Sequence, residues 1–213
     1  MADATPDRTR PQLYLITPPV FAPDAFAELL GRVLDLTDIA CIRLALASRD
    51  EDEIGRAADA VRAAAHQRDV AVVIETHIRL AERHGLDGVH LADGPRQVRD
   101  ARKALGADAI VGAFCGVTRH EGISAAEAGA DYAAFGPVGM SALGSGTVAP
   151  FDLFEWWSDV IEIPVVAEGG LSEALIRDLV PVTDFFGIGP EIWGSPDPAA
   201  ALKALAAAMG QVP

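Results

Sequence analysis

The chain has 213 residues, half of them hydrophobic, with 31 acidic and 17 basic side chains and a formal net charge of −14. This acidic balance repels phosphate polymers at long range and argues against nucleic-acid binding. The sequence holds no run of about 18 apolar residues, the length typical of a membrane span. Two cysteines far apart in sequence, and a polar first segment without the apolar region of a secretory signal, indicate a cytoplasmic protein.

Short apolar segments alternate with helix-compatible segments along the chain. Several of the apolar segments are hydrophobic throughout, which is typical of strands buried on both faces of a parallel sheet. The predicted strands are Leu13–Thr17, Ile39–Leu44, Val70–Ile74, Gly88–Leu91, Ala109–Ala113, Tyr132–Phe135, Pro164–Ala167 and Phe185–Ile188. The predicted helices are Asp24–Leu36, Glu51–Gln67, His77–His84, Pro95–Leu105, Arg119–Ala128, Phe151–Val160, Ser172–Val180 and Pro198–Met209.

Strand followed by helix, repeated about eight times at a spacing of roughly 20–30 residues, predicts an α/β fold, a single-domain (β/α)8 TIM barrel. The main rival is an open doubly wound sheet. Its Gly-rich dinucleotide loop is missing after the first strand, which runs into Thr17-Pro18-Pro19. We expect residues 1–11 to be a flexible tail and residues 12–213 to form the barrel.

Functional groups in such barrels lie where strands end and the following loops begin. In this chain these positions hold Thr17, Arg43, Glu75, Asp93, Cys115, the 136–146 loop, Glu168-Gly169-Gly170 and Gly189-Pro190-Glu191. The glycine turns after the seventh and eighth strands occupy the place where many barrels bind phosphate through backbone N–H groups. Glycine is also needed for tight turns without any ligand, so both interpretations stay open.

Four acidic residues fall at predicted strand ends: Glu75, Asp93, Glu168 and Glu191. One hypothesis is an acidic ring that holds a divalent cation or a cationic ligand, or that supplies acid–base chemistry. The alternative is that some of these acids pair with Arg43 or cap helices. His90 lies inside an apolar strand, a pattern that favours a buried, hydrogen-bonded histidine over a catalytic base.

Several motifs follow one another along the chain. They are Leu13-Tyr14-Leu15-Ile16-Thr17, Ile42-Arg43, Asp87-Gly88-Val89-His90-Leu91, Ala130-Asp131-Tyr132, Phe135-Gly136-Pro137-Val138 and Ile163-Pro164-Val165-Val166-Ala167-Glu168-Gly169-Gly170-Leu171. Over about residues 13 to 192, this order resembles the thiamine-phosphate synthase family, which includes the thiazole tautomerases. The resemblance implies a barrel that joins an aminopyrimidine diphosphate to a thiazole phosphate and releases pyrophosphate.

The resemblance also implies site residues. Arg43 matches the arginine that faces the pyrophosphate, and together with Glu75 and Asp93 it forms the expected catalytic set. Substrate binding is expected of Thr17, His90, Ser141, Glu168, Gly169, Gly170, Gly189 and Glu191. The implied cofactor is Mg²⁺, for which Glu75 and Asp93 are the candidate ligands, because the family's own ligand positions hold Thr76 and Pro95 here.

Other charged positions depart from the family pattern. Ala45 replaces a lysine, the 140–146 segment lacks one, and Pro190 replaces a phosphate-binding serine. Proline has no backbone N–H, and Glu191 beside it would repel an anion. We therefore expect a synthase-like protein of thiamine biosynthesis with weak or altered activity. The alternative is a catalytically degenerate barrel that binds a thiamine-related small molecule or a protein partner. A homo-oligomer also stays open.

Overall fold

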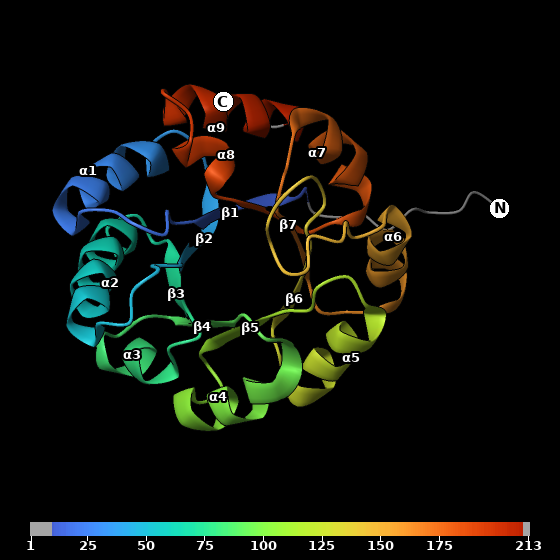
Figure 1. The fold of residues 1–213 in the computed structure, drawn as a ribbon, viewed down its shortest axis with the longest axis horizontal. Helices are drawn as coiled ribbons and strands as arrows, with labels where there is room; N and C mark the ends of the chain where they lie inside the picture. Colours follow the sequence, from blue (N-terminus) through green and yellow to red (C-terminus); the bar gives the residue numbers. More distant parts are fainter. Residues whose placement is uncertain (1–9, 211–213) are drawn as a thin grey trace.

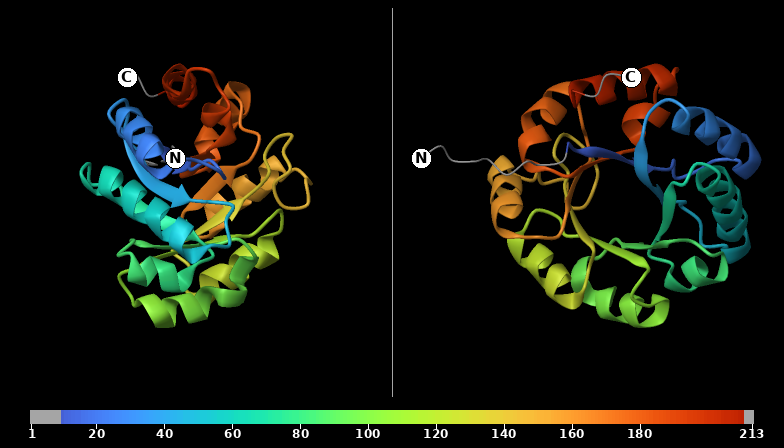
Figure 2. Two further views of the ribbon diagram at one scale, coloured as in Figure 1. Left: turned by 60° about the vertical axis from the view of Figure 1, so that its left-hand side comes forward. Right: turned by 180° about the vertical axis from the view of Figure 1, so that it is seen from behind.

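The computed structural model describes residues 10–210, and these form a closed barrel of eight parallel strands surrounded by helices (Figure 1). Each strand pairs with the next in sequence, and β8 pairs with β1 to close the ring. The view from behind shows the same closed ring (Figure 2). The predicted (β/α)8 barrel is confirmed.

The strands are β1 (Gln12–Ile16), β2 (Ile39–Leu44), β3 (Ala71–Glu75), β4 (Gly88–Leu91), β5 (Ile110–Phe114), β6 (Tyr132–Phe135), β7 (Val165–Glu168) and β8 (Phe185–Ile188). The α-helices are α1 (Pro23–Leu34), α2 (Glu51–His66), α3 (Ile78–Arg83), α4 (Val98–Leu105), α5 (Arg119–Ala128), α6 (Phe151–Val160), α7 (Glu173–Leu179), α8 (Pro190–Trp193) and α9 (Pro198–Ala208). Two 3₁₀ turns, η1 (Gly94–Gln97) and η2 (Val180–Val182), complete the set.

Most of the predicted tail, residues 1–9, lies outside the described residues. Of the remainder, Arg10 is exposed and donates a hydrogen bond to the carbonyl of Gly210 at 3.4 Å, whereas Pro11 is buried. The barrel begins directly after it, at the first residue of β1. Within residues 10–210, no helix combines the length and the apolar character that crossing a bilayer requires.

Side chains along each strand alternate between the two faces of the barrel wall, because successive residues of a strand point to opposite sides. Leu13 and Leu15 of β1 join the large hydrophobic core between the wall and the helices. Tyr14, between them, belongs to a second cluster inside the barrel, with Tyr132 of β6 and Cys41 of β2. The interior is therefore a packed layer of side chains below the mouth.

Glycines in two strands make room for large interior side chains, and a glycine in a third allows close approach of the neighbouring backbone. A Cβ on Gly112 of β5 would lie 1.9 Å from the ring of Tyr132. A Cβ on Gly187 of β8 would lie 2.9 Å from the Cβ of Glu168, and one on Gly88 of β4 would overlap the carbonyl oxygen of Ile110 at 1.8 Å. Tyr132 and Glu168 thus occupy space that any larger residue in the neighbouring strand would fill.

Element boundaries differ from the predicted ones in ways that matter for the mouth. β3 and β7 each end one residue later, so Glu75 and Glu168 are the last residues of strands rather than the first loop residues. The predicted helix at Pro95 begins as the 3₁₀ turn η1. The short helix α8, directly after β8, was not predicted, because four residues carry no helical periodicity.

Candidate active site

A buried arginine stands at the centre of the barrel mouth. Arg43, from β2, is 4% exposed and pairs closely with the 1% exposed Glu168 from β7. A second contact joins Arg43 Nη1 to Glu168 Oε1 at 3.4 Å. Glu75, at the end of β3, approaches from the other side, with its Oε2 3.7 Å from Arg43 Nε. The guanidinium is therefore held between two carboxylates, as the pairing alternative predicted.

A chain of hydrogen bonds runs from Arg43 down into the barrel. The guanidinium can only donate, so Nε2 of His90 accepts from Arg43 Nη1, and the histidine proton lies on Nδ1. Nδ1 then donates to the Tyr132 hydroxyl at 2.9 Å, which lies 2.7 Å from the hydroxyl of Tyr14. The Arg43 guanidinium also lies 5.8 Å from the Tyr14 ring centre, within cation–π range.

Burial dominates the electrostatics of this network. It lowers the pKa of His90 well below the ordinary histidine value, and the positive charge of Arg43 adds to the effect. Burial raises the pKa of Tyr132 and of Tyr14, so both phenols stay protonated. It also raises the pKa of Glu168, against the opposing effect of Arg43. His90 is thus the neutral, buried and hydrogen-bonded histidine that the sequence pattern favours.

Replacing His90 with glutamine is expected to reduce the loss in free energy of unfolding that accompanies a fall in pH below about 6.5. The unfolded histidine takes up a proton near pH 6.5, whereas the folded ring resists it, so stability is present above that pH and lost as the pH falls. Below about pH 6.5, wild type should lose about 1.4 kcal/mol per pH unit more than His90→Gln, measured by urea unfolding. His120→Gln, on the exposed surface of α5, should keep the wild-type slope. Equal slopes for wild type and His90→Gln would contradict the buried, neutral assignment.

Above the arginine, the mouth opens into a cavity of about 670 Å³. Eight of the predicted site residues line it: Thr17, Arg43, Glu75, Ser141, Glu168, Gly169, Gly170 and Glu191. The loop between β6 and α6, drawn in yellow beside the barrel opening in Figure 1, contributes Met140 and Leu143 to its wall. The Thr17 hydroxyl accepts from the N–H of Ala45 at 3.0 Å, which ties the ends of β1 and β2 together.

Three predicted site residues lie outside this lining. His90 is buried beneath the cavity. Gly189 does not line the cavity, but its backbone N–H donates to the carboxylate of Glu191, which does. Asp93 lines a separate hollow of about 350 Å³, with Cys115 and Thr118.

The sequence did not identify Tyr14 and Tyr132 as members of this network, although they lie at inward positions of their strands. For Tyr132, the signal that could have found it is Gly112 in the adjacent strand, because the bulky ring requires a glycine beside it.

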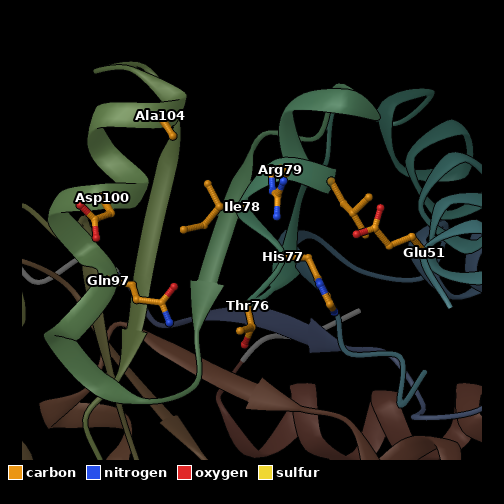
Figure 3. A pocket seen from close by; sticks show the side chains of 9 residues that line it. Glu51, Thr76, His77, Ile78, Arg79, Gln97, Asp100 and Ala104 are labelled. Atoms are coloured by element: carbon orange, nitrogen blue, oxygen red, sulfur yellow. The ribbon is translucent and has the colours of Figure 1, made fainter. Parts of the chain in front are cut away.

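A further hollow of about 380 Å³ lies between α3 and α4, where Figure 3 shows Ile78 and Gln97 on its sides. Its lining residues are Glu51, Thr76, His77, Ile78, Arg79, Leu80, Gln97, Asp100 and Ala104. It holds none of the predicted site residues. The mouth cavity is therefore the place where the predicted groups converge.

The two glycine turns at the mouth already hold a carboxylate of the chain itself. Glu191 Oε1 accepts from the N–H groups of Gly170 and Leu171, both at 3.1 Å. Its Oε2 accepts from the N–H of Gly189 at 2.9 Å. Gly169 and Gly170 have φ values of +83° and +74°, the left-handed conformation that brings successive N–H groups to one side. Glu191 thus neither pairs with Arg43 nor caps a helix, but binds backbone N–H groups of the two turns.

The residues present do not assemble a metal site. Glu75 faces Arg43, and Asp93 lines a different hollow. Across residues 10–210, no group of three or more His, Cys, Asp or Glu side chains is placed to hold a metal ion. Glu75 and Asp93 therefore do not converge on one metal position.

Fold and mouth together define a (β/α)8-barrel protein with a cavity, lined by charged and apolar side chains, at the carboxyl ends of its strands. Residues 13–183 match the family described as thiamine monophosphate synthase. A thiamine-phosphate synthase of Rhodospirillum centenum is 41% identical over 196 residues, covering 90% of this chain and 94% of that protein. One of Hyphomonas neptunium is 37% identical and covers 96% of each. The chain belongs to the thiamine monophosphate synthase family.

A solved structure agrees with this at the level of the fold. The thiamine phosphate pyrophosphorylase of Pyrococcus furiosus superimposes with a TM-score of 0.80 at 22% identity, covering 93% of this chain and 95% of that one. At this identity, the likeness concerns the barrel rather than the groups in its mouth.

Proposed function

We propose that this chain is a transferase of thiamine biosynthesis that joins an activated aminopyrimidine to a thiazole at the barrel mouth. The observation that carries the proposal is the state of Arg43. Its guanidinium lines the cavity, and its Nε has no hydrogen-bond partner among the described residues. When the donor's carbon–oxygen bond breaks, negative charge develops on the leaving pyrophosphate, and a preorganised guanidinium stabilises that charge.

The surrounding residues have distinct parts in this proposal. Glu168 and His90 are positioning residues, because both fix Arg43 through hydrogen bonds. Glu75, with 38% of its side chain exposed, is free to accept from the amino group of the pyrimidine. Ser141 and Thr17 supply hydroxyls to the wall. Asp93 takes no part, because it lines a separate hollow.

The charge of the cavity supports a second candidate, a barrel that binds a thiamine-related small molecule without turnover. Its charged lining residues are one guanidinium, Arg43, and three carboxylates, Glu75, Glu168 and Glu191. This balance suits a cationic or neutral ligand better than a polyanion. A thermal shift by the aminopyrimidine or the thiazole without consumption of either would favour this candidate.

Replacing Arg43 with lysine is expected to lower kcat/KM for coupling by about a hundredfold, the cost typical of losing one preorganised donor. Lysine keeps the charge but loses the planar guanidinium that reaches Glu168 and His90 together. The measurement is the initial rate of coupled product, with the aminopyrimidine diphosphate, the thiazole and magnesium supplied. Arg99→Lys, on the exposed surface of α4, is the control. Unchanged kcat/KM in Arg43→Lys would show that the Arg43 guanidinium takes no part in the reaction.

We also expect the protein to act in the cytoplasm on small molecules, without nucleic acid. A homo-oligomer stays a prediction.

A further inference from the structure

The turns after β7 and β8 form an anion cradle that the chain fills by itself. Three backbone N–H groups, from Gly170, Leu171 and Gly189, converge on the Glu191 carboxylate at 2.9–3.1 Å. Both carboxylate oxygens are used. Convergent N–H groups in this part of a barrel are the usual donors to a phosphate group. In this chain, no donor of the three is left for a second anion.

Two further features make this cradle unsuitable for phosphate. Pro190 lies at the start of the last turn and has no N–H to donate. The one basic residue that lines the cavity, Arg43, is paired with Glu168 rather than with Glu191, so it does not neutralise the carboxylate in the cradle. The two lysines of the chain, Lys103 and Lys203, lie on the outer helices α4 and α9. A phosphate dianion at the cradle would therefore meet the uncompensated charge of Glu191.

We propose that Glu191 is a specificity-determining residue that closes the phosphate cradle, so that the acceptor bound in the mouth cavity carries no phosphate. The acceptor is then a thiazole with an uncharged hydroxyl arm. The hydroxyls and apolar side chains of the wall, Ser141, Met140 and Leu143, provide neutral contacts for such an arm. The acceptor class rests on the proposed function, whereas the closed cradle rests on the hydrogen bonds alone.

Titration with inorganic phosphate, followed by calorimetry and phosphorus NMR, tests the closed cradle directly. Wild type should show no saturable binding. Glu191→Ala vacates the three N–H groups and removes the repelling charge, so it should bind phosphate at least about tenfold more tightly. Glu75→Ala is the matched control, because it removes one carboxylate from the same cavity and leaves the cradle filled. It should bind phosphate no better than wild type.

Saturable phosphate binding by wild type, with the affinity of Glu191→Ala, would overturn the proposal. Equal gains in Glu75→Ala and Glu191→Ala would also overturn it, because net charge alone would then explain the effect. If Glu191→Ala does not fold, the wild-type titration still decides between a closed and an open cradle.

Coupling assays with the thiazole alcohol and with its phosphate ester test the acceptor class. Wild type should prefer the alcohol, and Glu191→Ala should shift the preference toward the ester. A wild-type preference for the ester would overturn the assignment of Glu191. If neither acceptor is coupled while only Glu191→Ala binds phosphate, the proposed function fails and the closed cradle stands.

Discussion

Replacing Arg43 with methionine is expected to lower the free energy of unfolding by about 3–5 kcal/mol, the cost of leaving one partner of a buried ion pair alone. Glu168 is 1% exposed, so its buried carboxylate loses its partner once the guanidinium is gone. His90 Nε2 also loses its donor. Urea unfolding, monitored by circular dichroism, measures the difference.

The pH dependence of this loss has a definite sign. Burial raises the pKa of Glu168 and Arg43 opposes the rise, so removing Arg43 raises this pKa further. A carboxyl group whose pKa is raised on folding stabilises the fold below its unfolded pKa and loses that contribution as the pH rises through the folded value. The deficit of Arg43→Met should therefore shrink as the pH is lowered.

Two further variants separate the ion pair from a general effect of losing an arginine. The double variant Arg43→Met, Glu168→Met removes both charges and should recover most of the lost stability, because apolar replacements of buried pairs are often close to neutral. Arg68→Met breaks the Asp35 pair, whose side chains are 28% and 60% exposed, and should cost about 1 kcal/mol or less. A loss in Arg43→Met no larger than that in Arg68→Met would contradict the buried network.

Gly112→Ala is expected to destabilise the barrel by about 3 kcal/mol, at the upper end of typical overpacking costs. The new methyl group would lie 1.9 Å from the Tyr132 ring, which is itself fixed by hydrogen bonds to His90 and Tyr14. The ring must move, and the hydrogen-bond chain below Arg43 breaks with it. Coupling activity should fall together with stability.

Gly129→Ala is the matched control for this prediction. A Cβ at Gly129 meets nothing within 4 Å, and its left-handed φ of +100° is the only obstacle to a side chain. The cost should be about 1 kcal/mol, the strain of a left-handed residue. Equal losses for the two variants would show that the Tyr132 contact does not limit residue 112.

The barrel and the ring of mouth residues were predictable for one physical reason. Parallel strands of a barrel end at one rim, so residues at predicted strand ends meet whatever the details of packing. Arg43, Glu75, Glu168 and Glu191 reach one cavity on that basis, even where the strand boundary was wrong by one residue. Asp93 also follows a strand, yet the turn η1 carries it to a different hollow.

The partners of these residues were not predictable, because they depend on register and on side-chain size across the barrel. The contact between Tyr132 and His90 needs β4 and β6 to face each other across Gly112, which no local pattern specifies. The same limit applies to Glu191. Its position predicted repulsion of an anion, whereas the direction of its side chain, into the glycine turns, follows from the fold of α8.

The most direct test of the central claim is coupling by the wild-type protein. The purified chain is supplied with the aminopyrimidine diphosphate, magnesium and either the thiazole alcohol or its phosphate ester, and coupled product and pyrophosphate are quantified. We expect product and pyrophosphate to appear in equal amounts, faster with the alcohol. No product above the buffer control with either acceptor would contradict a transferase at the barrel mouth.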